Sequence, residues 1–202
     1  NERSTIYRKE NILPRAKEFD YDVILDRATD IFLEKGYEHT SVQDLVDHLG
    51  IHRRSIYDTY GDKRQLYLKI LNKYDQDMSQ NYVLITAKSI SIREKFEAIF
   101  KDSAFPKEEC RKGCLFVNSA IELALRDGDI ADQVQHFFEK TKSFFVLLLN
   151  QAKEKGELAA DIDTRILASY LNNALIGIRV LVRSETSRTE LENIIKTTLS
   201  IL

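Results

Sequence analysis

The stretch GIHRRSIYDTYGDKRQL, residues 50–66, places basic and aromatic side chains between two glycines and decides the fold. Gly50 and Gly61 suit the left-handed backbone conformation that ends a helix. Between them, Ile51 and Ile56 can anchor a short segment on one side while its basic residues stay on the other. The stretch therefore predicts a short helix over about residues 51–59, closed at each end by a glycine turn.

The residues before this stretch predict two more helices. Apolar side chains recur at helical spacing from Asp20, and Gly36 follows them as a stop. Thr40 or Ser41 can then cap a second helix whose apolar side chains are Val42, Leu45, Val46 and Leu49. Two short helices joined by a tight glycine turn, the second of them basic, are typical of the helix-turn-helix arrangement.

The residues after the stretch also predict helices alone. Asp62 can cap a long fourth helix, and apolar periodicity with stop signals predicts five further helices, over about 92–105, 114–125, 129–155, 163–184 and 187–202. No strand-like alternation runs beyond four residues. We therefore expect an all-α chain with a partly helical or flexible basic arm (1–19), a three-helix helix-turn-helix domain (20–66) and a larger helical domain (67–202).

Composition limits the classes of function. The 202 residues have a formal net charge of −2, so any contact with nucleic acid must come from a local basic surface. Acidic side chains lie mostly on the first two predicted helices, whereas the basic ones gather at the third. Only two cysteines occur and the first residues lack the apolar run of a signal peptide, so we expect a cytoplasmic protein. The apolar stretch 166–182 is interrupted by Asn172, Asn173 and Arg179, which favours a buried helix over a membrane span.

The helix-turn-helix arrangement predicts a DNA-binding surface on the third helix. Side chains near the start of such a helix can reach base edges in the major groove, whereas hydroxyl and ammonium groups around it bind phosphates. The alternative interpretation is that the basic residues of this helix face solvent and have no binding role. The residues expected to contact DNA are Thr40, Ser41, His52, Arg53, Arg54, Ser55, Tyr57, Tyr60 and Lys63.

The segment 24–71 resembles the N-terminal domain of the tetracycline-repressor (TetR) family of bacterial transcription regulators. The matching elements are Phe32, Gly36-Tyr37, Thr40-Ser41-Val42, Leu49-Gly50-Ile51, Ile56-Tyr57 and Tyr60-Gly61-Asp62-Lys63. This resemblance implies an all-helical homodimer that binds a palindromic operator in double-stranded DNA, with an effector pocket and the dimer interface in the C-terminal domain. The chain departs from the family in having Tyr60 where Phe is commoner and His52-Arg53-Arg54 at the start of the third helix. We expect these departures to affect operator choice.

The larger helical domain is rich in phenylalanine, and we expect most of these rings in a packed core. A minority of aromatic and amide side chains would then line an effector pocket. The candidates are Tyr82, Phe96, Phe100, Phe116, Asn118, Phe137, Tyr170 and Asn173. The last two predicted helices are apolar on more than one face, which predicts a two-fold dimer through a four-helix bundle.

Two other classes of function remain open from the sequence. A DNA-binding regulator without a small-molecule effector could be controlled by a protein partner or by oxidation at Cys110 and Cys114. A helical enzyme is the third class, but no catalytic constellation, cofactor motif or metal-ligand spacing occurs. His48 and His52 stand four residues apart, yet Gly50 separates them onto different predicted helices, so we expect no metal site.

Overall fold

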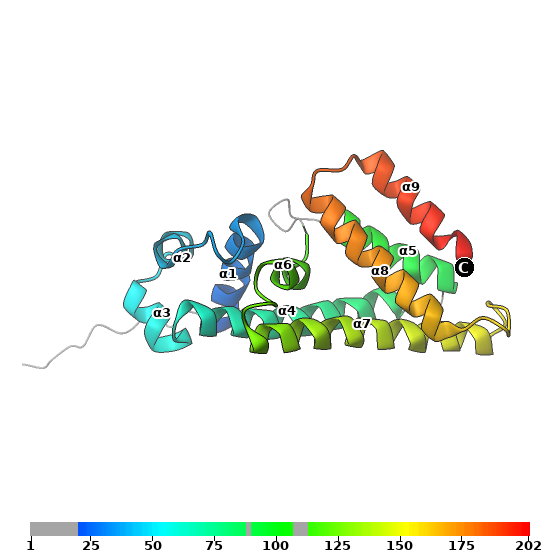
Figure 1. The fold of residues 1–202 in the computed structure, drawn as a ribbon, viewed down its shortest axis with the longest axis horizontal. Helices are drawn as coiled ribbons and strands as arrows, with labels where there is room; N and C mark the ends of the chain where they lie inside the picture. The colour runs from blue at the N-terminus through cyan, green and yellow to red at the C-terminus, as the bar shows by residue number, and fades with distance from the viewer. Residues whose placement is uncertain (1–19, 88–89, 107–112) are drawn as a thin grey trace, which may run out of the picture.

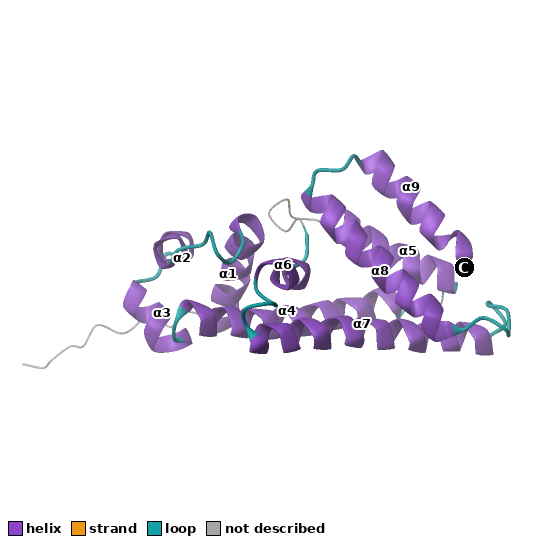
Figure 2. Ribbon diagram, in the orientation of Figure 1, coloured by secondary structure: helices purple, strands orange, loops and turns teal. Residues whose placement is uncertain are grey.

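The computed structural model describes residues 20–87, 90–106 and 113–202, and these residues form helices joined by short loops (Figure 2). The expectation of an all-α fold is confirmed. The predicted arm 1–19 and Cys110 lie outside the described residues. The helices are α1 (Tyr21–Lys35), α2 (Val42–Leu49), α3 (Arg53–Tyr60), α4 (Lys63–Thr86), α5 (Ile92–Ala104), α6 (Leu115–Glu122), α7 (Gly128–Glu154), α8 (Thr164–Arg183) and α9 (Arg188–Thr198), the last followed by a 3₁₀ turn, Leu199–Ile201.

Capping side chains fix where most of these helices begin. A serine or aspartate accepts a backbone N–H bond at seven starts, at Asp20, Ser41, Asp62, Ser91, Asp127, Asp163 and Ser187. Such a cap contributes about 1 kcal/mol to helix stability. Two starts lack one. α3 begins at Arg53 rather than near Ile51, and the helix predicted over 114–125 covers only Leu115–Glu122.

The turn between α2 and α3 depends on Gly50. Its φ of 68° and ψ of 27° lie in the left-handed region, and its N–H donates to the Val46 carbonyl at 2.9 Å. A side chain there would bring the strain that L-residues meet at positive φ. The turn sends the chain into α3 while Leu49, Ile51 and Ile56 remain buried together.

The helix α4 joins two hydrophobic cores. Its first half, including Leu66 and Ile70, packs in a core with α1, α2, α3, α6 and the start of α7. Its second half brings Tyr82 into a core with α5, α8 and α9. Twenty-four residues of helix span about 36 Å, so α4 runs along the molecule from the helix-turn-helix end to the other end (Figure 1). The predicted boundary between residues 66 and 67 falls inside this continuous helix.

The helix α8 provides the inner side of the larger domain. It packs against α7 and α5 and buries Leu171, Leu175 and Ile178. Within the described ranges it is also the one helix long and apolar enough to cross a membrane by length and composition. In this fold, α8 is a core helix beside α7 (Figure 1).

Candidate nucleic-acid interface

The helix α3 presents its basic residues to solvent. His52, Arg53 and Arg54 are exposed, whereas Ile56 and Tyr60 are buried and hold the other side of the helix against the core. Ser55, the fourth residue expected to read bases, is half-buried. Because His52 is the N-cap residue, the three exposed side chains lie at the start of α3, where base contacts of a recognition helix are made.

The two arginines differ in their neighbours. Arg54 Nε lies 3.3 Å from Asp58 Oδ2, one turn along α3, and both side chains are largely exposed. An exposed pair of this kind contributes little to stability, so DNA can replace Asp58 as the partner of Arg54. Across the described ranges, Arg53 has no carboxylate within 4.0 Å. Both guanidinium groups are thus available at the surface.

The two tyrosines of α3 have different environments. Tyr57 keeps 45% of its surface exposed, as a phosphate-contacting side chain must. Tyr60 is 3% exposed and its hydroxyl donates to the Tyr21 carbonyl at 3.3 Å. Burial raises the pKa of Tyr60 to about 12. The expectation that Tyr60 contacts a phosphate is therefore corrected: its ring packs on Tyr21 and anchors the start of α1.

Thr40 and Ser41, both expected at the DNA, have separate structural roles. Thr40 is fully buried, and its hydroxyl donates to the Gly36 carbonyl at 2.6 Å. It therefore shapes the loop between α1 and α2, which corrects its assignment as a DNA contact. Ser41 is exposed and forms a capping box with Asp44 at the start of α2. Hydrogen bonds from Lys35 and Ser41 hold the pKa of Asp44 well below its usual range.

Lys63 begins α4 and lies half-buried over an aromatic ring. Its Nζ is 4.2 Å from the centroid of Tyr37, a cation–π geometry. Desolvation lowers the pKa of Lys63, against the opposing effect of Glu38 and Glu122. The Tyr37 ring thus positions the ammonium near the α4 N-terminus, where backbone N–H groups also favour an anion. The sequence motif contained Gly36-Tyr37, but the pairing with Lys63 was not predicted.

Long-range hydrogen bonds hold α2 and the loop between α1 and α2 in place. Arg27 of α1 donates to the carbonyl oxygens of His48 and Leu49, the end of α2. Glu122 of α6 accepts from the backbone N–H groups of Tyr37 (2.8 Å) and Glu38 (3.3 Å). The sequence analysis does not identify Arg27 or Glu122, because their partners are distant in the chain. Arg27 and Leu49 are 22 residues apart, and Glu122 and Tyr37 are 85 residues apart.

The predicted effector-pocket residues do not form one site. Phe96 and Phe100 are fully buried in the core around α5, and Phe116 stacks on Phe137 with centroids 4.1 Å apart. Tyr82 and Phe137 line a cavity of about 210 Å³ between α4 and α7. Asn118 is buried on α6, whereas Tyr170 and Asn173 lie on the exposed face of α8. The expectation that Tyr170 and Asn173 line a pocket is therefore corrected: both lie on an exposed helix surface.

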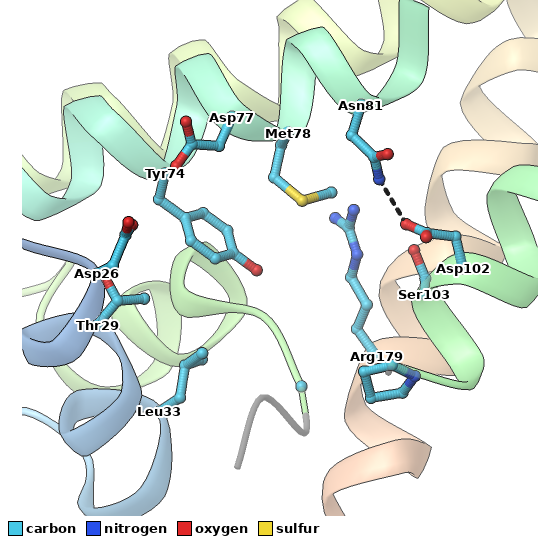
Figure 3. A pocket seen from close by; sticks show the side chains of 12 residues that line it. Asp26, Thr29, Leu33, Tyr74, Asp77, Met78, Asn81, Asp102, Ser103 and Arg179 are labelled. Atoms are coloured by element: carbon cyan, nitrogen blue, oxygen red, sulfur yellow. Dashed lines mark hydrogen bonds between the residues drawn. The ribbon is translucent and has the colours of Figure 1, made fainter. Parts of the chain in front are cut away.

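A larger cavity, of about 330 Å³, lies where the two cores meet. Its walls come from α1, α4, α5 and α8 (Figure 3), and none of the eight predicted pocket residues lines it. No local pattern in the sequence indicates this cavity, since its lining residues are spread from Asp26 to Arg179. Both the helix-turn-helix domain and the larger domain therefore contribute residues to its wall.

Comparison with known proteins supports both parts of the fold. Residues 24–70 match the family described as "Bacterial regulatory proteins, tetR family", and residues 93–198 match the family described as "Tetracyclin repressor-like, C-terminal domain". The chain is 35% identical to YezE of Bacillus subtilis (strain 168), an HTH-type transcriptional regulator, over 93% of this chain and 98% of YezE. It is 28% identical to the HTH-type transcriptional repressor ComR of Escherichia coli (strain K12), over 93% and 90% of the two chains.

A solved structure shows the same fold on DNA. A cysteine mutant of the regulator CifR, complexed with a 26-bp double-strand operator, superposes with a TM-score of 0.82. It is 26% identical to this chain, and the match covers 92% of this chain and 98% of CifR. The fold described above is therefore one that binds operator DNA in another protein.

Proposed function

The chain belongs to the TetR family of bacterial transcription regulators, and from this premise we propose that it is a homodimeric repressor of a palindromic operator. A small molecule bound in the C-terminal domain releases it from DNA. We place its action in the cytoplasm, where bacterial DNA is found. The repressor ComR and the operator complex of CifR support this proposal by similarity.

The observation that carries the proposal is the exposed start of α3. His52, Arg53 and Arg54 are all exposed, while the buried Ile56 and Tyr60 fix the orientation of the helix. Arginine can donate two hydrogen bonds to a guanine edge, and histidine can donate or accept one. Tyr57 and Ser41 are exposed and Lys63 is half-buried, and their hydroxyl and ammonium groups can bind phosphate oxygens.

The proposed dimer uses the exposed face of α8. Ile166, Tyr170, Asn173, Gly177 and Val180 are exposed at spacings of four, three, four and three residues. These spacings place them in one stripe along the helix, as in the seam between packed helices. Ile166 alone leaves 69% of its surface exposed. Pairing α8 and α9 with those of a second copy covers the stripe and relates two α3 helices by two-fold symmetry.

The proposed release depends on the junction between α1 and α8. Arg183, at the end of α8, donates to the carbonyl oxygens of Leu33 and Glu34, at the end of α1. The 330 Å³ cavity lies beside this junction and takes Leu33 as one of its lining residues. A ligand that moves α8 relative to α1 changes the separation of the two α3 helices, and operator affinity falls.

Of the two cysteines in the alternative that invokes oxidation, only Cys114 belongs to the described residues. Cys114 is 1% exposed at the start of α6, and Cys110 lies outside the described residues. Reagents reach a buried thiol slowly.

A binding-site selection from random double-stranded DNA, followed by a footprint, tests the function. The proposal predicts an enriched palindrome that the purified dimer protects on both half-sites. Recovery of no preferred sequence, or protection of a single asymmetric site by a monomer, contradicts it.

A further inference from the structure

The cavity at the junction of the two cores has a buried arginine in its wall. Arg179 of α8 is 2% exposed and extends between α4 and α5 (Figure 3). Its Nη2 donates to the Tyr82 hydroxyl, and the guanidinium lies 5.7 Å from the centroid of the Phe137 ring. Within the described part of the chain, Arg179 forms no ion pair and its Nη1 has no hydrogen-bond partner. A buried, unpaired guanidinium is costly, and an anion beside Arg179 would offset that cost.

The acids in the cavity wall already have other partners. Asp26 and Asp77 both bind Lys73, at 2.8 and 2.7 Å. Asp102 accepts from the Asn81 amide at 2.7 Å (Figure 3). None of these three carboxylates lies within 4.0 Å of Arg179. Among the described residues, the wall therefore provides no counter-ion for this guanidinium.

A second polar atom of the same wall also lacks a partner. Ser103 Oγ, on α5, is buried beside the Tyr82 hydroxyl and makes no hydrogen bond of good geometry with a described residue. Buried polar groups without partners are rare in folded proteins and call for an explanation. Arg179 Nη1 is a donor and Ser103 Oγ can donate as well, so both can bind one acceptor group.

We propose that this cavity binds a small organic monocarboxylate, whose carboxylate is held by Arg179 and Ser103. One unpaired guanidinium balances one negative charge. Leu33, Met78 and Pro106 are the apolar side chains among the other lining residues, and in this proposal they contact the hydrocarbon part. The volume of about 330 Å³ suits a compact ligand at the small end of the range for protein pockets.

The position of the cavity gives such an acid a regulatory effect, which rests on the proposed function as an operator-binding repressor. Asp26, Thr29 and Leu33 of α1 line the cavity opposite Arg179 of α8. Arg183, one turn after Arg179, donates to the Leu33 carbonyl. Binding at Arg179 therefore acts on α8, whose last residue contacts α1 of the DNA-binding domain.

Isothermal titration calorimetry of the full-length protein without DNA tests the site. The probes are benzoate, phenylacetate and hexanoate, each paired with its uncharged primary amide. We expect at least one acid to bind at least tenfold more tightly than its amide. Equal binding of every acid and its amide, or no binding of any acid at millimolar concentration, overturns the proposal.

The variant Arg179→Met keeps an unbranched, flexible side chain and removes the charge. We expect it to lose the binding of the acid while its Tm stays equal to or above that of the wild type, because an unpaired buried charge has been removed. Arg188→Met, on an exposed arginine of α9, is the matched control and should bind the acid normally. Unchanged acid binding by a folded Arg179→Met protein contradicts the site. The wild-type comparison of acids with amides decides the matter even if this variant fails to fold.

Operator binding is then measured separately with the acid that binds. Release of the DNA by this acid, but not by its amide, supports its role as the effector. Binding of the acid without release contradicts the regulatory role and leaves the anion site standing. Failure to bind any operator contradicts the proposed function, while calorimetry still decides the site.

Discussion

Arg64, at the start of α4, binds Asp127, the N-cap residue of α7, through two hydrogen bonds of 2.6 and 2.8 Å. The same guanidinium reaches Asp129 at 2.6 Å. These contacts join the end of the helix-turn-helix segment to the long helix of the larger domain. They form just after α3 ends, next to Lys63 in the chain, so they hold this part of the DNA-binding domain on the body of the protein.

This ion pair predicts an acid-sensitive contribution to stability. The Arg64 guanidinium holds the pKa of Asp127 below its ordinary value of 3.8. A carboxyl whose pKa is lowered by folding stabilises the protein above its unfolded pKa, and the stabilisation is lost as pH falls through the folded pKa. Asp127→Asn keeps a capping side chain and removes the charge. We expect it to lower Tm by a few degrees at pH 7 and to differ less from the wild type near pH 3.

Thermal unfolding across this pH range measures the effect. Asp161→Asn, at an exposed aspartate, is the control and should match the wild type throughout. A difference between Asp127→Asn and the wild type that stays constant from pH 7 to pH 3 would show that the carboxylate charge is irrelevant.

The two tyrosines of α3 provide a matched pair. Tyr57→Phe removes an exposed hydroxyl, and we expect it to weaken operator binding about fivefold, the effect of one hydrogen bond. Tyr60→Phe removes a hydroxyl bonded to the Tyr21 carbonyl, so it should change operator affinity less than about twofold and lower the stability by about 1 kcal/mol. Fluorescence anisotropy and chemical unfolding measure these two quantities. If Tyr60→Phe weakens operator binding and Tyr57→Phe does not, Tyr60 contacts the DNA.

Lys63 is expected to bind phosphate rather than bases. Lys63→Ala should weaken binding to every sequence alike and reduce the slope of log affinity against log salt by about 1. Lys196→Ala, at an exposed lysine of α9, removes the same charge far from α3 and should leave the slope unchanged. If Lys63→Ala instead changes which sequences are preferred, the lysine reads bases.

The exposed stripe of α8 predicts the oligomeric state. Tyr170→Glu places a charge in the middle of this stripe and should convert the dimer to a monomer in sedimentation experiments. Operator affinity should fall by about 100-fold, because each half-site is then bound independently. Leu125→Glu introduces the same group at another exposed apolar residue and should remain dimeric. A wild-type protein that sediments as a monomer at all concentrations would defeat the claim.

The sequence predicts the helices well because their ends depend on local groups. The side chains of Asp20, Ser41 and Asp163 accept hydrogen bonds from backbone N–H groups no more than three residues further along the chain. Gly50 by itself supplies the left-handed conformation that ends α2. The exposed surface of α3 follows equally from local spacing, since Arg53 and Arg54 face away from Ile56.

Contacts between distant residues could not be predicted in this way. Tyr60 resembles Tyr57 in the sequence, but its hydroxyl meets a carbonyl 39 residues away. The partner of Arg64 lies 63 residues away, and the cavity around Arg179 requires four helices to meet. Effector-pocket residues chosen for aromatic and amide character therefore fell partly in the core and partly on the outer face of α8.

Binding-site selection with the wild type, Arg53→Ala and Arg54→Ala tests most directly whether α3 reads the operator. The wild type should enrich a palindrome whose half-sites are about one helical turn, or a multiple of it, apart. Each variant should relax or change the preference at particular base pairs, with a loss of about 1–3 kcal/mol on the original operator. Equal losses on all sequences, with the enriched palindrome unchanged for both variants, would reduce these arginines to phosphate contacts and contradict base reading by α3.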